Sequence, residues 1–329
     1  MDVADRAIAE IERLCGQDIQ RRNIGPLADF TRGNLVRAAA AIARHPSPSV
    51  AIITGFYLGH GEPPNCETDG PPGAAMLAAG FAAAGIPCRI ATDLVNSRVV
   101  LATAAAADPR GEIPIDIVAM RPDGGDGATV MVQVEAAWRR QRPAITHVIS
   151  IERCGPSRDG CPRDARGVDM TDYNAPLESL FNAGPWTTIG IGDLGNEIGM
   201  GSLPQELVAR SVPRGDQIWC RVGCDYPIVG GVSNWAGAAL LGAVALLRPR
   251  GAGAMLESLR PEFARRLLEA AVWEGGAVAS DRSGAIPRNH MFVDCQPWPV
   301  LEQVHRQIYD LCRHALLAGE SQAKVTSPR

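Results

Sequence analysis

The sequence lacks three features that define large classes of protein. It has no excess of basic residues, because 32 Lys and Arg stand against 36 Asp and Glu, for a formal net charge of -4. Proteins that bind nucleic acids or anionic membranes usually carry basic patches, so this balance argues against both kinds of partner. The longest apolar run, Trp235 to Leu247, is too short to cross a bilayer. The N-terminal residues also lack the basic-then-apolar order of a secretory signal, so we expect a cytoplasmic protein that acts on a small molecule.

The sequence also lacks the short motifs of several enzyme classes. It contains no convincing Gly-x-Ser-x-Gly elbow or Walker loop, and a dinucleotide site is excluded because the Asp193 carboxylate would lie where the pyrophosphate must bind. Nine cysteines, an odd number, do not suggest a disulfide framework, and we expect most to be buried thiols. The pairs Cys154/Cys161 and Cys220/Cys224 lack the spacing of a zinc knuckle, and no histidine pair accompanies them.

The order of apolar segments predicts one large α/β domain over residues 1–329, with a mostly parallel or mixed sheet flanked by helices. Short β-branched runs that end in glycine or polar residues alternate with segments of helical periodicity. Strands are expected at 50–54, 87–91, 115–119, 147–151, 187–191 and 217–222. Helices are expected at 3–19, 35–43, 74–84, 128–140, 237–247, 261–273 and 300–317. Residues 1–22 are expected to form an N-terminal amphipathic helix, and 318–329 a disordered tail.

The most informative segment is the glycine-rich run that follows the predicted strand Thr187–Ile191. Its glycines give the backbone freedom that other residues lack, so Asp193, Asn196 and Glu197 emerge together at the carboxyl end of a strand. Ligands bind at that edge of open α/β sheets, so we expect these three side chains to form part of a site. Two alternatives are a turn whose Glu197 complements the opening of a helix near Ile198, and a glycine-rich anion cradle.

A second acidic pair, Glu67 and Asp69, ends the long loop that leaves the first predicted strand. Helix capping explains Asp69 but not Glu67. Two carboxylates about 4 Å apart repel by roughly 4 kcal/mol at an effective dielectric of about 20, so convergence of the two acidic groups would require a divalent cation or shared protons. Oxygen ligands favour Mn²⁺, Mg²⁺ or Ca²⁺ over zinc. The predicted metal ligands are Glu67, Asp69, Asp193, Asn196 and Glu197.

Further candidates follow the predicted strand 147–151 and precede the predicted helix 237–247. Glu152 is predicted as a ligand or general base, and Arg153 as a clamp for a substrate carboxylate; a solvated ion pair is the alternative. Asp159, in the loop that follows, is a candidate substrate contact. Ser233 and Asn234 stand at a helix start, where substrate contact and helix capping are equally good explanations.

Together these motifs resemble the D-glutamate cyclase family, in the domain that ends the longer animal proteins and stands alone in many microbes. The resemblance rests on Thr54–Phe56, Glu67–Ala74, Ile151–Arg153 with Asp159-Gly160, Gly190–Gly201 and Gly231–Trp235. It implies a lyase that closes D-glutamate to 5-oxo-D-proline with loss of water, and a divalent metal in an acidic cavity. The sequence departs from the family pattern at Leu194, where glycine is usual, and at Asp164, where Asn is usual.

The implied reaction suggests roles for the candidate residues. The α-amine attacks the γ-carboxylate of the same molecule, so the main obstacle is the poor electrophilicity of an ionised carboxylate. A divalent cation held by Asp193 and its acidic neighbours would neutralise that charge, Glu152 would take the ammonium proton, and Arg153 would hold the α-carboxylate. The alternative functions are a metal-dependent phosphate-ester hydrolase and a non-catalytic amino-acid or metal-binding module. A homo-oligomer is possible.

Overall fold

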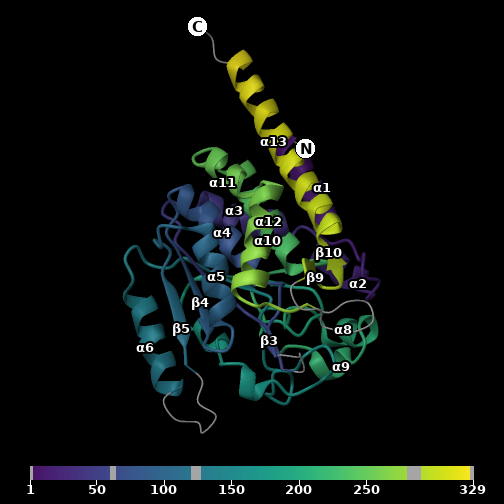
Figure 1. Ribbon diagram of the computed structural model, residues 1–329. Coiled ribbons are helices and arrows are strands. Elements are labelled where there is room, and N and C mark those ends of the chain that lie inside the picture. Colours follow the sequence, from purple (N-terminus) through teal and green to yellow (C-terminus); the bar gives the residue numbers. More distant parts are fainter. Residues whose placement is uncertain (1–2, 60–63, 120–126, 280–289, 327–329) are drawn as a thin grey trace.

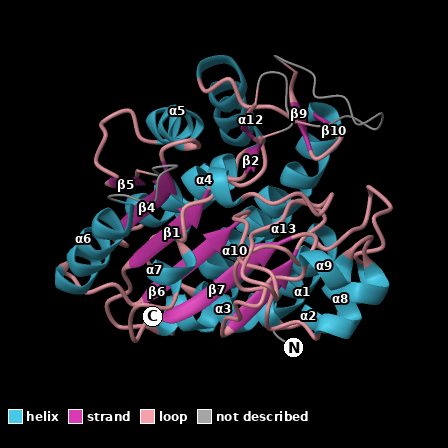
Figure 2. Ribbon diagram, turned by 90° about the horizontal axis from the view of Figure 1, so that it is seen from below, coloured by secondary structure: helices cyan, strands magenta, loops and turns pink. Residues whose placement is uncertain are grey.

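Six parallel strands form one sheet in the order β5-β4-β1-β6-β7-β8 (Figure 2). The computed structural model describes residues 3–59, 64–119, 127–279 and 290–326. The strands are β1 (Val50–Thr54), β4 (Cys88–Asp93), β5 (Ile115–Val118), β6 (His147–Ile151), β7 (Thr187–Gly192) and β8 (Tyr226–Val229). The chain runs outward from β1 to β5 and then returns to place β6 on the other side of β1. The topological switch point therefore lies between β1 and β6, where ligands bind in folds of this kind.

Helices cover both faces of the sheet (Figures 1 and 2). Along β1, Ile52 belongs to the hydrophobic cluster around helix α10, whereas Ile53 belongs to the cluster around Trp138 on the opposite face. The first face carries α1 (Val3–Cys15), α3 (Asn34–Arg44), α4 (Pro71–Ala83), α5 (Ser97–Ala107), α10 (Ser233–Leu247), α11 (Ala252–Ser258), α12 (Pro261–Glu269) and α13 (Trp298–Thr326). The second face carries α6 (Gly127–Arg140) and α7 (Glu178–Phe181). Burial on both faces explains why apolar residues predominate in the central strands β1 and β6.

Smaller elements lie around this framework. Helices α2 (Gly25–Thr31), α8 (Gln205–Ser211) and α9 (Gly215–Ile218) pack near the β8 edge. Two short antiparallel hairpins are β2 (Tyr57–Leu58) with β3 (Asn65–Cys66), and β9 (Phe292–Val293) with β10 (Gln296–Pro297). A 3₁₀ turn spans Thr171–Tyr173, and a π-helical turn, Ala270–Glu274, extends α12.

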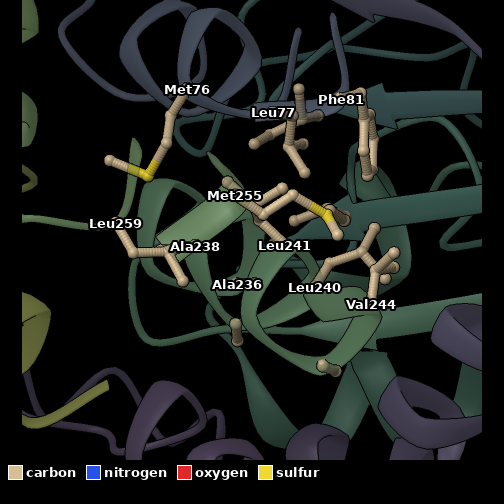
Figure 3. Packing of buried hydrophobic residues seen from close by; sticks show 14 of the residues in the cluster. Met76, Leu77, Phe81, Ala236, Ala238, Leu240, Leu241, Val244, Met255 and Leu259 are labelled. Atoms are coloured by element: carbon tan, nitrogen blue, oxygen red, sulfur yellow. The ribbon is translucent and has the colours of Figure 1, made fainter. Parts of the chain in front are cut away.

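Helix α10 is the centre of the larger hydrophobic cluster, because nearly all of its residues are buried. Leu240, Leu241 and Val244 of α10 meet Phe81 of α4 there (Figure 3). A Cβ atom at Gly80 would lie 2.6 Å from Leu241 Cδ2, so the small residues of α4 allow close approach of the two helices. This packing fixes the N-termini of α4 and α10 relative to each other.

The single α/β domain and its parallel sheet are as predicted, but some boundaries differ. The strand predicted at 217–222 was wrong: Ile218 ends the short helix α9, and Ile218 and Cys220 pack against Leu203 and Val208 without joining the sheet. The alternating apolar pattern there reflects burial under the glycine-rich segment. The edge strand is instead β8, which starts at Tyr226 and was missed.

The two ends of the chain also differ from expectation. Helix α1 ends at Cys15 and a turn follows, so the predicted helix over 1–22 was too long; residues 1–2 lie outside the described part. Helix α13 continues to Thr326, where a disordered tail from Ala318 was expected, and 327–329 lie outside the described part. Figure 1 shows α13 extending away from the body of the domain. No helix in the described ranges combines the length and apolar character needed to cross a membrane.

Candidate active site

Three carboxylates from separate segments meet at the carboxyl end of the sheet. Asp69 precedes α4, Glu152 directly follows β6, and Asp193 directly follows β7. Each offers a ligand oxygen, and these oxygens lie within 4.8 Å of one another. All three side chains are buried. We call this group the acidic triad; it joins two predicted metal ligands to the predicted general base.

Asp69 and Asn234 cap each other's helices. The Asp69 carboxylate accepts hydrogen bonds from the backbone N–H groups of Ser233 and Asn234 at the start of α10, at 2.7 and 2.8 Å. In return, Asn234 Oδ1 accepts from the N–H groups of Gly70 and Gly73 at the start of α4, at 3.0 and 2.8 Å. The amide of Asn234 is thereby occupied, so capping accounts for this residue and substrate contact does not. Two helix N-termini converge on the triad, and their partial positive charge stabilises carboxylates there.

Glu152 has a left-handed backbone conformation (φ 44°) that ends β6. Ser233 Oγ donates a hydrogen bond of 2.5 Å to Glu152 Oε2, so Ser233 positions this carboxylate. Gly70 is needed for this arrangement, because a Cβ atom there would lie 2.8 Å from Glu152 Cβ. A non-glycine residue in the left-handed region is strained, and such strain persists where surrounding contacts hold it.

Glu197 holds the glycine-rich turn. Its carboxylate accepts hydrogen bonds from the backbone N–H groups of Asp193, Leu194 and Gly195, at 2.8 to 2.9 Å. A Cβ atom at Gly192 would lie 2.5 Å from Glu197 Oε2, which explains the glycine at the end of β7. The predicted role of Glu197 as a metal ligand is corrected, because Glu197 is not among the three carboxylates whose ligand oxygens lie within 4.8 Å of one another. Its carboxylate instead holds the turn that presents Asp193.

Arg153 forms a buried ion pair with Asp93, at the end of β4. Its Nη2 lies 2.7 Å from Asp93 Oδ2 and also donates to the carbonyl of Ala175, while Nη1 donates to the carbonyl of Gly55. Both charged side chains are 0% exposed. The predicted role of Arg153 as a substrate clamp is corrected, because both terminal nitrogens of the guanidinium bind internal groups and Arg153 does not line the cavity described below.

The remaining predicted residues divide between a cavity and the surface. A cavity of about 190 Å³ opens beside two members of the triad, and Glu67 and Asn196 line it. Asn196 Nδ2 donates to the carbonyl of Arg163. Asp159 is exposed and forms an ion pair with Arg163 at 2.6 Å, away from the cavity lining. Its predicted role as a substrate contact is corrected.

The cavity lining also includes charged residues that the sequence analysis did not propose for the site, among them Arg22 and Asp294. Arg22, in the turn after α1, places Nη2 2.5 Å from Asp193 Oδ2 and 3.6 Å from Asp294 Oδ2. Asp294 and Cys295 form the two-residue turn of the β9–β10 hairpin, with φ values of 48° and 61°. Positive φ at both positions is typical of a type I′ turn, but Asp-Cys lacks the glycine that signals it. Arg22 and Asp193 are 171 residues apart, so no local pattern could connect them.

The electrostatics of the cavity are unfavourable without a counter-ion. Burial, reinforced by repulsion from neighbouring carboxylates, raises the pKa of Glu67, Asp69 and Glu152 well above the usual range. Burial also raises the pKa of Asp193 to about 7, although Arg22 opposes this shift. Such groups share protons or bind a cation, because several unpaired buried charges are costly.

The donor set fits a hard divalent cation. The triad supplies carboxylate oxygens in place of the thiolate and imidazole ligands that zinc prefers. Thr68 Oγ1 is buried, and no hydrogen-bond partner for it exists among the described residues, although Thr68 lines the cavity. A bound ion or its water would satisfy such an orphaned oxygen.

Comparison with known proteins agrees with this geometry. Residues 11–308 match the family described as D-glutamate cyclase-like, C-terminal. The chain belongs to this family. It is also 33% identical over 250 residues to the human protein named D-glutamate cyclase, mitochondrial. That alignment covers 74% of this chain and 39% of the human protein, so the chain spans about two fifths of the length of this relative. The resemblance inferred from the motifs is confirmed, and the family match includes both Arg22 and Asp294.

The raised pKa values predict how stability depends on pH. A carboxyl group with a raised pKa binds protons more tightly when folded, so its stabilising contribution is full below its unfolded pKa of about 4 and is lost as the pH rises toward its folded pKa. For Asp193 and Asp294 that folded pKa is about 7. We therefore expect the Tm of the metal-free protein to fall by a few degrees between about pH 5 and pH 8.

Scanning calorimetry with and without saturating Mn²⁺ checks this expectation. A cation that binds the deprotonated carboxylates should restore the Tm at the alkaline end of the range, because metal affinity rises as the ligands lose protons. The double variant Asp193→Asn/Asp294→Asn should have a shallower pH dependence. A Tm that rises with pH in the metal-free protein would contradict the expectation.

Proposed function

We propose that this protein is a metal-dependent cyclase that converts D-glutamate to 5-oxo-D-proline and water. The acidic triad is the observation that carries the proposal, because it places three buried ligand oxygens within 4.8 Å beside a cavity at the switch point of the sheet. Family membership supports a lyase-type enzyme at the level of reaction class. The triad could hold a divalent cation that would activate the γ-carboxylate of the substrate.

The size of the cavity agrees with a substrate no larger than an amino acid. Its volume of about 190 Å³ lies below the roughly 300 to 1,000 Å³ of pockets for drug-sized ligands. Its lining is dominated by charged and polar groups, as expected for a small zwitterion with a second carboxylate.

Each member of the triad has a role in this proposal. Asp69 and Asp193 would hold a divalent cation with Glu152 at its edge, and the bound cation would polarise the γ-carboxylate as a Lewis acid. Burial raises the pKa of Glu152 in the metal-free cavity, but a bound cation would favour its ionised form, in which it could take the first proton from the substrate ammonium. Ser233 keeps that carboxylate oriented.

The reaction balances without any further reactant. The amine nitrogen forms a bond to the γ-carbon, and one carbon–oxygen bond of the γ-carboxylate breaks. The two protons that the ammonium group loses leave with the departing oxygen as water. The nucleophile and electrophile belong to one molecule, so the site needs only to fold the substrate and neutralise the carboxylate.

An NMR assay tests the proposal. The purified protein is first treated with EDTA and then supplied with Mn²⁺, Mg²⁺ or Ca²⁺ and with D- or L-glutamate, while 5-oxoproline is followed by ¹H NMR. We expect product from D-glutamate, and loss of product after chelation. Release of phosphate from a phosphate ester without 5-oxoproline would support a hydrolase instead, and tight glutamate binding without turnover would support a binding module.

A further inference from the structure

The turn between α1 and α2 places Arg22 in the lining of the acidic cavity, although no sequence motif includes this residue. We propose that Arg22 binds the α-carboxylate of the substrate and so determines the preference for an amino acid with two carboxylates. This inference rests on the proposed function and names the group that recognises the part of the substrate that does not react.

Only one nitrogen of the Arg22 guanidinium, Nη2, makes the contacts described here with other groups of the protein. Its three contacts, with Asp193, Asp294 and the carbonyl of Gly231, are all made by Nη2. Nε has no hydrogen-bond partner among the described residues, and none of these contacts involves Nη1. The side chain lines the cavity and is 21% exposed. Arg22 thus has donor capacity beyond what the folded protein uses.

The backbone of the turn that carries Arg22 is fixed by hydrogen bonds, and this sets the direction in which the side chain leaves the turn. The Asp18 carboxylate accepts hydrogen bonds from the backbone N–H groups of Arg22, Asn23 and Ile24, at 2.8, 2.7 and 3.2 Å. Arg21 and Asn23 on either side have left-handed backbones, with φ of 58° and 64°. A turn fixed in this way presents the side chain with little entropy left to lose on binding.

The negative charge of the cavity means that a substrate with two carboxylates needs a cationic side chain to bind there. Glu67, Asp164, the triad and Asp294 place six carboxyl groups around the cavity, and one divalent cation compensates for only part of the charge that they can carry. A glutamate with a net negative charge would be repelled unless its second carboxylate had a cationic partner. The guanidinium of an arginine does not lose its proton in proteins. Arg22 is therefore charged whenever the substrate binds.

The distances suit one glutamate molecule. Its two carboxyl carbons are separated by four C–C bonds and so lie about 5 Å apart at most. Arg22 Nη2 is 2.5 Å from Asp193 Oδ2, and the ligand oxygens of the triad lie within 4.8 Å of one another. A substrate with its γ-carboxylate at the triad can therefore place its α-carboxylate at Arg22. The other arginine in the cavity lining, Arg166, is exposed.

Comparison of two substrates tests this role. 4-Aminobutanoate has the same amine and the same reacting carboxylate as glutamate but no α-carboxylate, and its cyclisation gives 2-pyrrolidinone and water. We would measure kcat/KM for D-glutamate and for 4-aminobutanoate in the wild type, Arg22→Gln, Arg22→Lys and Arg166→Ala, all loaded with Mn²⁺. If 4-aminobutanoate is converted too slowly for kcat/KM to be measured, its Ki as a competitive inhibitor of D-glutamate conversion is measured instead.

The ratio of kcat/KM for D-glutamate to kcat/KM for 4-aminobutanoate measures the contribution of the α-carboxylate. Damage to Asp193 or to metal binding affects both substrates alike, whereas loss of the clamp affects only glutamate. We expect Arg22→Gln to lower the ratio by about 10- to 100-fold, the loss of one charge-assisted hydrogen bond. In Arg22→Lys the ratio should lie between the values of the wild type and Arg22→Gln. In Arg166→Ala it should equal the wild-type value. An unchanged ratio in Arg22→Gln, or a loss confined to Arg166→Ala, would overturn the inference.

This outcome is distinct from failure of the proposed function. If the wild type makes no 5-oxoproline, the proposed function fails before Arg22 is tested. In that case competition of D-glutamate and 4-aminobutanoate for binding, measured by calorimetry on the wild type and Arg22→Gln, still shows whether the guanidinium recognises the α-carboxylate.

Discussion

Asp193→Asn is expected to lower kcat for 5-oxoproline formation by about 1,000-fold or more, because stabilisation by a Lewis acid contributes several kcal/mol. Asp193 is the triad member at the end of β7, and Asn offers a neutral amide where a charged ligand is needed. The substitution also removes the charged partner of Arg22. Steady-state kinetics and Mn²⁺ titration by calorimetry measure the two consequences, and both should fall together.

The fold should survive this substitution. The turn that presents Asp193 is held by Glu197 through backbone N–H groups, which Asn at position 193 retains. The far-UV circular dichroism spectrum should therefore be that of the wild type. Asp159→Asn is the matched control, because Asp159 is exposed and pairs with Arg163 outside the cavity; its kcat should not change. Wild-type kinetics in Asp193→Asn would remove this residue from the mechanism.

Most of the sheet could be predicted from the sequence because its strands are buried on both faces. The segment Val50–Thr54 has four apolar residues in succession and is bounded by breakers, so it is readily identified as a buried strand rather than a surface segment. The segment 217–222 shows the limit of the same reasoning. Its alternating apolar residues are buried under a loop, and periodicity cannot distinguish burial within a sheet from burial beside one.

The site could be predicted only in part, because local sequence indicates where a side chain begins but not what it contacts. Asp193 was identified as an acid at the end of a strand and Asp69 as an acid before a helix, and the structure brings them together. Glu197 has the same chemistry and lies only four residues from Asp193, yet it faces its own backbone. Arg22 and Asp294 come from a turn and a hairpin whose positions depend on tertiary packing, so no motif could include them.

Arg153→Met is expected to destabilise the protein by about 3 to 5 kcal/mol, the usual cost when one partner of a buried ion pair is removed. Asp93 would lose its ion-pair partner, in a position with no exposure to solvent. The carbonyls of Gly55 and Ala175 would lose their donors as well. Urea denaturation of the metal-free protein measures the change in the free energy of unfolding.

The double variant Asp93→Asn/Arg153→Met separates the charge from the packing. It should recover part of the lost stability, because no uncompensated charge remains and the single carbonyl oxygen of Asn can still accept from the N–H group of Asn96, which now binds Asp93 Oδ1. A substrate clamp would behave differently: its removal would raise KM for D-glutamate while leaving the free energy of unfolding unchanged. That result would support the predicted role of Arg153 as a clamp for a substrate carboxylate. It would also contradict the ion pair with Asp93 as the reason for the burial of Arg153.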